Sequence, residues 1–82
     1  MHDRIKRVMS DVFGTPASEL PDDPTIDNVP EWDSLRHIEL MLALESEFSV
    51  HFSTEAMLEL LSMDAIAAYL REQETTAERR EV

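Results

Sequence analysis

The sequence predicts an all-α fold: a small four-helix bundle with three longer helices, one short third helix and a long loop between the first and second helices. Two observations carry this prediction. Apolar residues recur at the i, i+3, i+4 spacing of amphipathic helices, whereas the alternation of a half-buried strand does not occur. All four prolines fall within residues 16–30, so the turn-forming residues gather in a single connection.

The first helix is predicted over residues 3–13. Its apolar residues fall at i, i+3, i+4, i+7 and i+8, on one helix face: Ile5, Val8, Met9, Val12 and Phe13. Gly14, the only glycine, follows where a glycine commonly ends a helix. Residues 15–33 are predicted to form a loop, whose length indicates either a function or packing onto the bundle. Its candidate apolar anchors are Leu20, Ile26, Val29 and Trp32.

The second helix is predicted over residues 34–48 and has the strongest pattern. One stripe runs through Leu35, Ile38, Leu42 and Glu45, and another through Leu40, Leu44 and Phe48. The helix is apolar around more than half of its circumference. We therefore expect other helices to flank it on two sides.

Two further helices are predicted after residue 53. Ser53 or Thr54 can N-cap a short third helix that reaches Leu61, and Ser62 can cap a fourth. The buried face of the fourth helix is marked by Met63, Ile66, Ala67 and Leu70. The chain after Leu70 is too polar to be anchored on the bundle. We expect one domain over residues 1–74 and a disordered polar tail over residues 75–82.

The composition excludes several classes of protein. A chain of 82 residues forms one domain with a small core, without room for a large enclosed pocket. Its net charge of −11 repels nucleic acid and anionic membranes, so we expect neither as a partner. Cysteine is absent, which excludes disulfides and thiolate metal sites. Neither a signal peptide nor a membrane-spanning segment is recognisable, so we expect a cytoplasmic protein. The start at Met1 favours a free-standing protein, with a domain of a longer chain as the alternative, and we expect a monomer.

The negative charge is concentrated around one serine. Between residues 11 and 70, Arg36 is the only basic residue. Ser34 lies in the middle of this acidic region, where the proline-rich loop passes into the second helix. An acidic face is commonly just solvated, but its concentration around one candidate serine favours a docking surface for basic partner proteins.

Ser34 has three interpretations from the residues alone. Asp33 or Ser34 can simply be the N-cap of the helix. Ser34 and His37, at i and i+3, can share a helix face as a hydrolase pair, but an exposed helix end offers neither an oxyanion hole nor a group that orients the histidine. We therefore expect His37 to be a surface residue beside Ser34 and not a catalytic base. Phosphorylation of Ser34 is the third, with only Arg36 nearby to receive the phosphate.

A resemblance to a known family adds a fourth interpretation. It depends on Asp33-Ser34-Leu35, Ile38-Glu39-Leu40, Ala43-Leu44-Glu45, Phe48 and Phe52, with Ala65 and Tyr69-Leu70 in the last helix. These motifs, at these positions along an acidic four-helix pattern, resemble the acyl carrier protein family over roughly residues 3–72.

The resemblance implies a carrier and not an enzyme. Ser34 would be the attachment point of 4′-phosphopantetheine, transferred from coenzyme A by a phosphopantetheinyl transferase (a holo-synthase). Acyl or aminoacyl groups would be carried on this arm as thioesters and presented to acyl-loading and acyl-processing enzymes. The positions that match the docking surface of such carriers are Asp33, Leu35, Arg36, Glu39, Leu42 and Glu45. Related carriers can shelter a cargo between helices; whether Met9, Leu42, Leu58 or Leu61 line such a space stays open.

Two residues depart from carriers of bacterial fatty acid synthesis. Those carriers usually have glycine two residues before the serine and an acidic residue two after it; here the residues are Trp32 and Arg36. Arg36 inverts one charge of the docking surface, which favours a specialised pathway, such as polyketide or aminoacyl biosynthesis, over fatty acid synthesis. A lone tryptophan in a loop is more commonly an anchor. The alternative function is an acidic helical interaction module without a prosthetic group.

Overall fold

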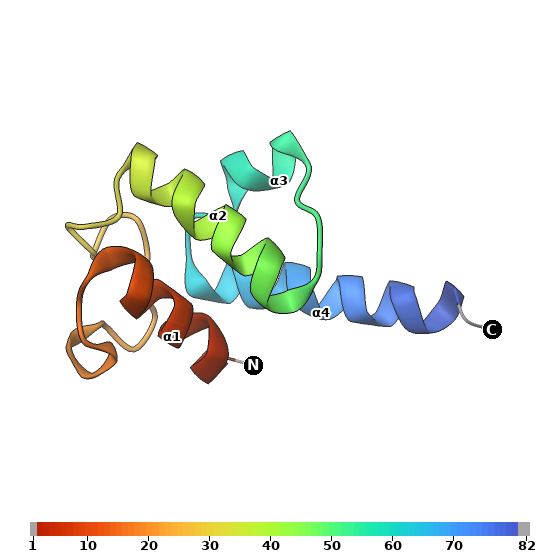
Figure 1. The fold of residues 1–82 in the computed structure, drawn as a ribbon, viewed down its shortest axis with the longest axis horizontal. Coiled ribbons are helices and arrows are strands. Elements are labelled where there is room, and N and C mark those ends of the chain that lie inside the picture. Colours follow the sequence, from red (N-terminus) through yellow and green to blue (C-terminus); the bar gives the residue numbers. More distant parts are fainter. Residues whose placement is uncertain (1, 81–82) are drawn as a thin grey trace.

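The computed structural model describes the backbone of residues 2–80 and the side chains of residues 2–73. Its elements follow in the order α1 (His2–Phe13), the 3₁₀ helix η1 (Ala17–Glu19), α2 (Ser34–Phe48), α3 (Thr54–Glu59) and α4 (Met63–Arg80). The all-α prediction, with a short third helix and a long first loop, is confirmed. Figure 1 shows α1, α2 and the first half of α4 around one core, with the last turns of α4 extending beyond the other helices.

The core is formed by the apolar faces that the helical spacing indicates. Ile5 and Met9 of α1 are fully buried, as are Leu40 and Leu44 of α2 and Ile66 of α4. Arg4 fastens α1 to the far end of α2, because its guanidinium donates to the Glu47 carboxylate and lies 4.3 Å from the centre of the Phe48 ring. These contacts fix α2, which carries Ser34 at its other end.

The long loop packs on the bundle through its predicted anchors. Leu20, Val29 and Trp32 are buried, and Ile26 is half-buried against the core. Two backbone hydrogen bonds join the loop to the segment between α3 and α4. The amide of Ile26 donates to the Leu61 carbonyl at 3.0 Å, and the amide of Met63 donates to the Pro24 carbonyl at 2.9 Å. The loop therefore holds the α3–α4 junction close to the start of α2.

Other helices flank α2 on two sides, α1 on one and α3 on the other (Figure 1), but they leave part of its apolar surface uncovered. The stripe through Leu40 and Leu44 is buried, but Leu35, Ile38 and Leu42 are 66%, 55% and 56% exposed. The reason is the length of α3. Six residues make about 9 Å of helix, which cannot cover the roughly 22 Å of the fifteen-residue α2. An apolar face of α2 is left in contact with solvent.

The fourth helix extends beyond its predicted apolar face. Met63, Ile66, Ala67 and Leu70 are buried as expected, and the backbone continues as helix to Arg80. Residues 71–80 are rich in Arg, Glu and Gln, which favour helix even without burial. Of the tail predicted over residues 75–82, residues 81 and 82 lie outside the described residues. The domain boundary at residue 74 and the disorder of the tail stay predictions.

Candidate functional site

Ser34 is the first residue of α2, and its hydroxyl is not used by the helix. The N-cap is Asp33, whose backbone is extended and whose carboxylate Oδ1 accepts the amide hydrogen of Arg36 at 2.8 Å. Ser34 is exposed. Its hydroxyl makes no hydrogen bond to the residues whose side chains the structure describes. Of the two residues that could cap α2, Asp33 does so and Ser34 remains available for modification.

The other serines at helix starts are used as caps. Ser53 Oγ accepts the amide of Ala56 at the start of α3, and Ser62 Oγ accepts the amide of Ala65 at the start of α4, both at 3.1 Å. Both caps were predicted from the sequence. Ser34 differs from these two serines because a neighbouring carboxylate has taken over the capping function.

The position of Ser34 suits an anionic substituent. The first amides of an α-helix carry partial positive charge, and a helix of fifteen residues has an aligned macrodipole. A phosphodiester on Ser34 Oγ would lie at this positive end. The chain therefore provides both an exposed, unpaired nucleophilic oxygen and a favourable electrostatic environment for a phosphate attached to it.

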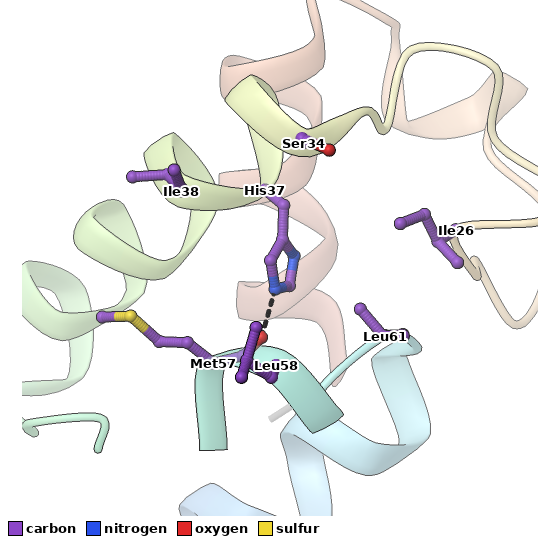
Figure 2. A pocket seen from close by; sticks show the side chains of 7 residues that line it. All are labelled: Ile26, Ser34, His37, Ile38, Met57, Leu58 and Leu61. Atoms are coloured by element: carbon purple, nitrogen blue, oxygen red, sulfur yellow. Dashed lines mark hydrogen bonds between the residues drawn. The ribbon is translucent and has the colours of Figure 1, made fainter. Parts of the chain in front are cut away.

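An open apolar groove begins beside Ser34 and passes between α2 and α3 (Figure 2). Its volume is about 270 Å³, and its lining comprises Ile26, Ser34, His37, Ile38, Met57, Leu58 and Leu61. Of the four residues considered as lining for a cargo, Leu58 and Leu61 line this groove. Met9 lies fully buried in the core and Leu42 lies on the exposed face of α2. A group attached to Ser34 would have an apolar surface within reach.

His37 is not the surface residue expected from the sequence. Its Nδ1 accepts a hydrogen bond from the indole Nε1–H of Trp32 at 2.9 Å, and its Nε2–H donates to the carbonyl oxygen of Met57 in α3. Both ring nitrogens are therefore occupied. Figure 2 shows the imidazole pointing away from Ser34 towards α3. A base for Ser34 needs a nitrogen within hydrogen-bonding reach of the hydroxyl, and this arrangement does not provide one.

The residues predicted to dock partner proteins fall into two groups. Leu35, Glu39 and Leu42 are exposed on α2, and the N-cap Asp33 is exposed just before it. The other two, Arg36 and Glu45, are partly buried and make contacts within the fold. The Arg36 guanidinium donates to the Phe13 carbonyl at 3.4 Å, and the Glu45 carboxylate accepts the amide of Phe52 at 2.8 Å and lies 3.2 Å from His51 Nδ1.

Within the part of the chain that the structure describes, no three His, Asp or Glu side chains gather as a metal site, and no helix is long and apolar enough to cross a membrane.

Comparison with models of known protein families identifies one family that matches the chain. The model for the phosphopantetheine attachment site matches residues 3–70, most of the chain and all four helices up to Leu70.

The chain belongs to the phosphopantetheine attachment site family. Members of this family carry a covalently attached 4′-phosphopantetheine group, so this chain has a phosphopantetheine-carrier role. The match agrees with the exposed, unpaired hydroxyl at the start of α2 and with the adjoining groove, which together fit such a group. No curated protein matches the chain.

Proposed function

We propose that Ser34 is the attachment residue and that the protein carries acyl or aminoacyl intermediates as thioesters on its 4′-phosphopantetheine arm. The observation that carries this proposal is the free hydroxyl of Ser34 at the positive end of α2, beside a carboxylate that caps the helix in its place. The arm supplies a terminal thiol, which the chain lacks because it has no cysteine.

The exposed side of α2 supports docking of partner enzymes. Leu35 and Leu42 offer apolar contact area on this face, and the N-cap Asp33 and Glu39 of the helix are exposed carboxylates. An interface of this kind combines an apolar centre with charges that steer a basic partner. The expected partners are the phosphopantetheinyl transferase and the acyl-loading and acyl-processing enzymes.

The proposed carrier does no chemistry of its own. The hydrolase interpretation requires a histidine nitrogen for Ser34, and both nitrogens of His37 are bonded elsewhere. The departures at Trp32 and Arg36 favour a specialised pathway, with fatty acid synthesis as the other possibility. The cytoplasmic location and the monomeric state remain parts of this proposal.

The proposal is tested by loading the purified protein. Incubation with a promiscuous phosphopantetheinyl transferase and coenzyme A is expected to add the mass of one phosphopantetheine group, and Ser34→Ala is expected to add none. Incubation with an activated acyl donor and a loading enzyme should then add a cargo that hydroxylamine removes, as it does from thioesters. Absence of the first mass gain with several transferases would overturn the proposal.

The same protein samples test the interaction module without a prosthetic group. That function predicts an unmodified chain and partner binding that Ser34→Ala does not change. A hydrolase would instead turn over an ester substrate in the unmodified state and lose this activity in both Ser34→Ala and His37→Ala. The first result would favour the interaction module over the carrier, and the second would favour the hydrolase.

A further inference from the structure

The half-buried imidazole of His37 links three parts of the fold. Trp32 belongs to the long loop, His37 to α2 and Met57 to α3. Trp32 is 2% exposed, and its ring lies 5.5 Å from that of Phe13 at the end of α1. The Trp32–His37–Met57 chain of hydrogen bonds therefore runs from a side chain fixed in the core to the backbone of α3.

The partners of His37 determine its protonation. The indole nitrogen of tryptophan can only donate a hydrogen bond, and a backbone carbonyl can only accept one. Nδ1 must then be unprotonated and Nε2 must carry the proton, which is the neutral Nε2–H tautomer. A charged imidazolium has N–H groups at both positions and cannot accept from Trp32.

The Met57 carbonyl needs a donor that its own helix does not provide. In an α-helix this oxygen would accept from the amide of Leu61, but α3 ends at Glu59 and the Leu61 amide donates to the Glu59 carbonyl at 2.9 Å. The last carbonyls of a helix need partners from outside it. His37 supplies that partner and thereby caps α3 from the side of α2.

Helix α3 depends on few other attachments. Of its six residues only Ala56 is buried, and Leu58 is 70% exposed. The loop segment around Ile26 secures the residues after α3, at Leu61. The His37 contact is made within the helix, one residue before the groove-lining Leu58.

We propose that His37 is a positioning residue: a neutral latch, oriented by Trp32, that fastens α3 against α2 and fixes the groove beside Ser34. This proposal does not depend on modification of Ser34, because the latch exists in the unmodified chain. Its loss leaves the attachment residue exposed but lets α3, with Met57 and Leu58, move relative to it.

The tautomer is measured on the unmodified wild-type protein by long-range ¹H–¹⁵N NMR correlation. The expected spectrum shows His37 with Nδ1 unprotonated and Nε2 protonated. Trp32 is the only tryptophan, so its indole signal is unambiguous. This signal is expected to show a coupling across the hydrogen bond to His37 Nδ1. A protonated Nδ1, or an indole hydrogen that exchanges with solvent as fast as in an unfolded chain, would overturn the proposal.

The fastening of α3 is measured by amide hydrogen exchange. Replacement of His37 by Phe keeps a ring but removes both hydrogen bonds. Exchange of the Leu60 amide, which closes α3 on the Ala56 carbonyl, is expected to rise about threefold to tenfold, corresponding to the loss of one net hydrogen bond. The amides of α1 are expected to keep their wild-type exchange rates, because their exchange requires the opening of a part of the structure that His37 does not hold.

Two variants separate positioning from general destabilisation. In His37→Gln the amide oxygen can accept from Trp32 and the amide nitrogen can donate to Met57, so this variant is expected to restore slow exchange in α3. His51→Phe changes an exposed histidine whose ring lies beside Glu45, away from α3, and is expected to leave α3 and the indole signal unchanged. Equal acceleration in α1 and α3 of His37→Phe, or failure of the glutamine variant to restore slow exchange, would refute the latch.

Discussion

The guanidinium of Arg36 donates a hydrogen bond to the backbone carbonyl of Phe13, the last residue of α1, over 3.4 Å. The carbonyl end of a helix carries partial negative charge and is stabilised by a nearby cation. Arg36 therefore caps α1 from the first turn of α2. The charge that departs from the usual acidic residue of bacterial fatty acid carriers has a structural partner within the fold.

Arg36 is expected to affect stability and partner choice separately. Arg36→Asp removes the cap and brings a negative charge to the carbonyl end of α1, which should cost about 1 kcal/mol in urea unfolding. Arg36→Gln removes the charge but keeps a donor for Phe13, and should cost less. If the charge decides partner choice, Arg36→Asp should still raise the rate of loading by fatty acid synthesis enzymes. Unchanged rates in both variants would remove Arg36 as a determinant of the partner.

The N-cap of α2 should depend on the side-chain oxygen of Asp33 more than on its charge. Asp33→Ala leaves the amide of Arg36 without this partner and should lower the free energy of unfolding by about 1 kcal/mol, whereas Asp33→Asn keeps the cap. If the Asp33 carboxylate also docks the transferase, Asp33→Asn will slow modification of Ser34 without loss of stability. Equal stability of the alanine variant and the wild type would contradict the assigned cap.

Replacement of an exposed leucine of α2 should affect modification more than stability, whereas replacement of a buried leucine should affect stability. Leu35→Ala is expected to change the free energy of unfolding by no more than about 0.5 kcal/mol because the side chain is mostly in water, yet to slow modification by the transferase. Leu44→Ala removes a fully buried side chain and should cost about 3 kcal/mol. Modification kinetics and urea unfolding of both variants measure the difference. Wild-type modification of Leu35→Ala would remove this face as the docking surface.

Two residues with positive φ provide a matched test of how the left-handed backbone conformation affects stability. Ser49, which ends α2, has φ 54°, and Gly14, which follows α1, has φ 70°. Ser49→Gly should stabilise the fold by about 1 kcal/mol because glycine adopts this conformation without a steric penalty. Gly14→Ala should destabilise it by a similar amount through backbone strain alone, because a Cβ at this position meets no atom within 4 Å. Thermal unfolding with the same sign for both variants would contradict this account.

The helices and their anchors were predictable because their signals are local. The spacing of Ile5 and Met9 determines the buried face of α1, and the loop anchors are recognisable as isolated apolar residues among turn formers. The residues Asp33-Ser34-Leu35 placed the candidate attachment point at the helix start. What remained ambiguous from the sequence was which of Asp33 and Ser34 caps the helix, since both residue types do so.

The contacts of Arg36 and His37 were not predictable from the sequence. Their acceptors are the backbone carbonyls of Phe13 and Met57. Every residue has a carbonyl, so the sequence does not indicate which one accepts the hydrogen bond. The exposure of Leu35 likewise depends on how far α3 reaches, a tertiary property that helical periodicity does not contain. Leu35, Arg36 and His37 lie within three positions of Ser34. This short segment therefore contributes both to the candidate site and to the contacts between helices.

The most direct test of the account is the location of the phosphopantetheine group within the chain. Cleavage after arginine releases a peptide of residues 8–36, which contains Ser10, Ser18 and Ser34, and tandem mass spectrometry of this peptide identifies the modified serine. Ser53→Ala and Ser62→Ala, which remove the serines that cap α3 and α4, are the matched controls. The group is expected on Ser34 in the wild type and in both controls. A group on any other serine, or undiminished modification of Ser34→Ala, would contradict it.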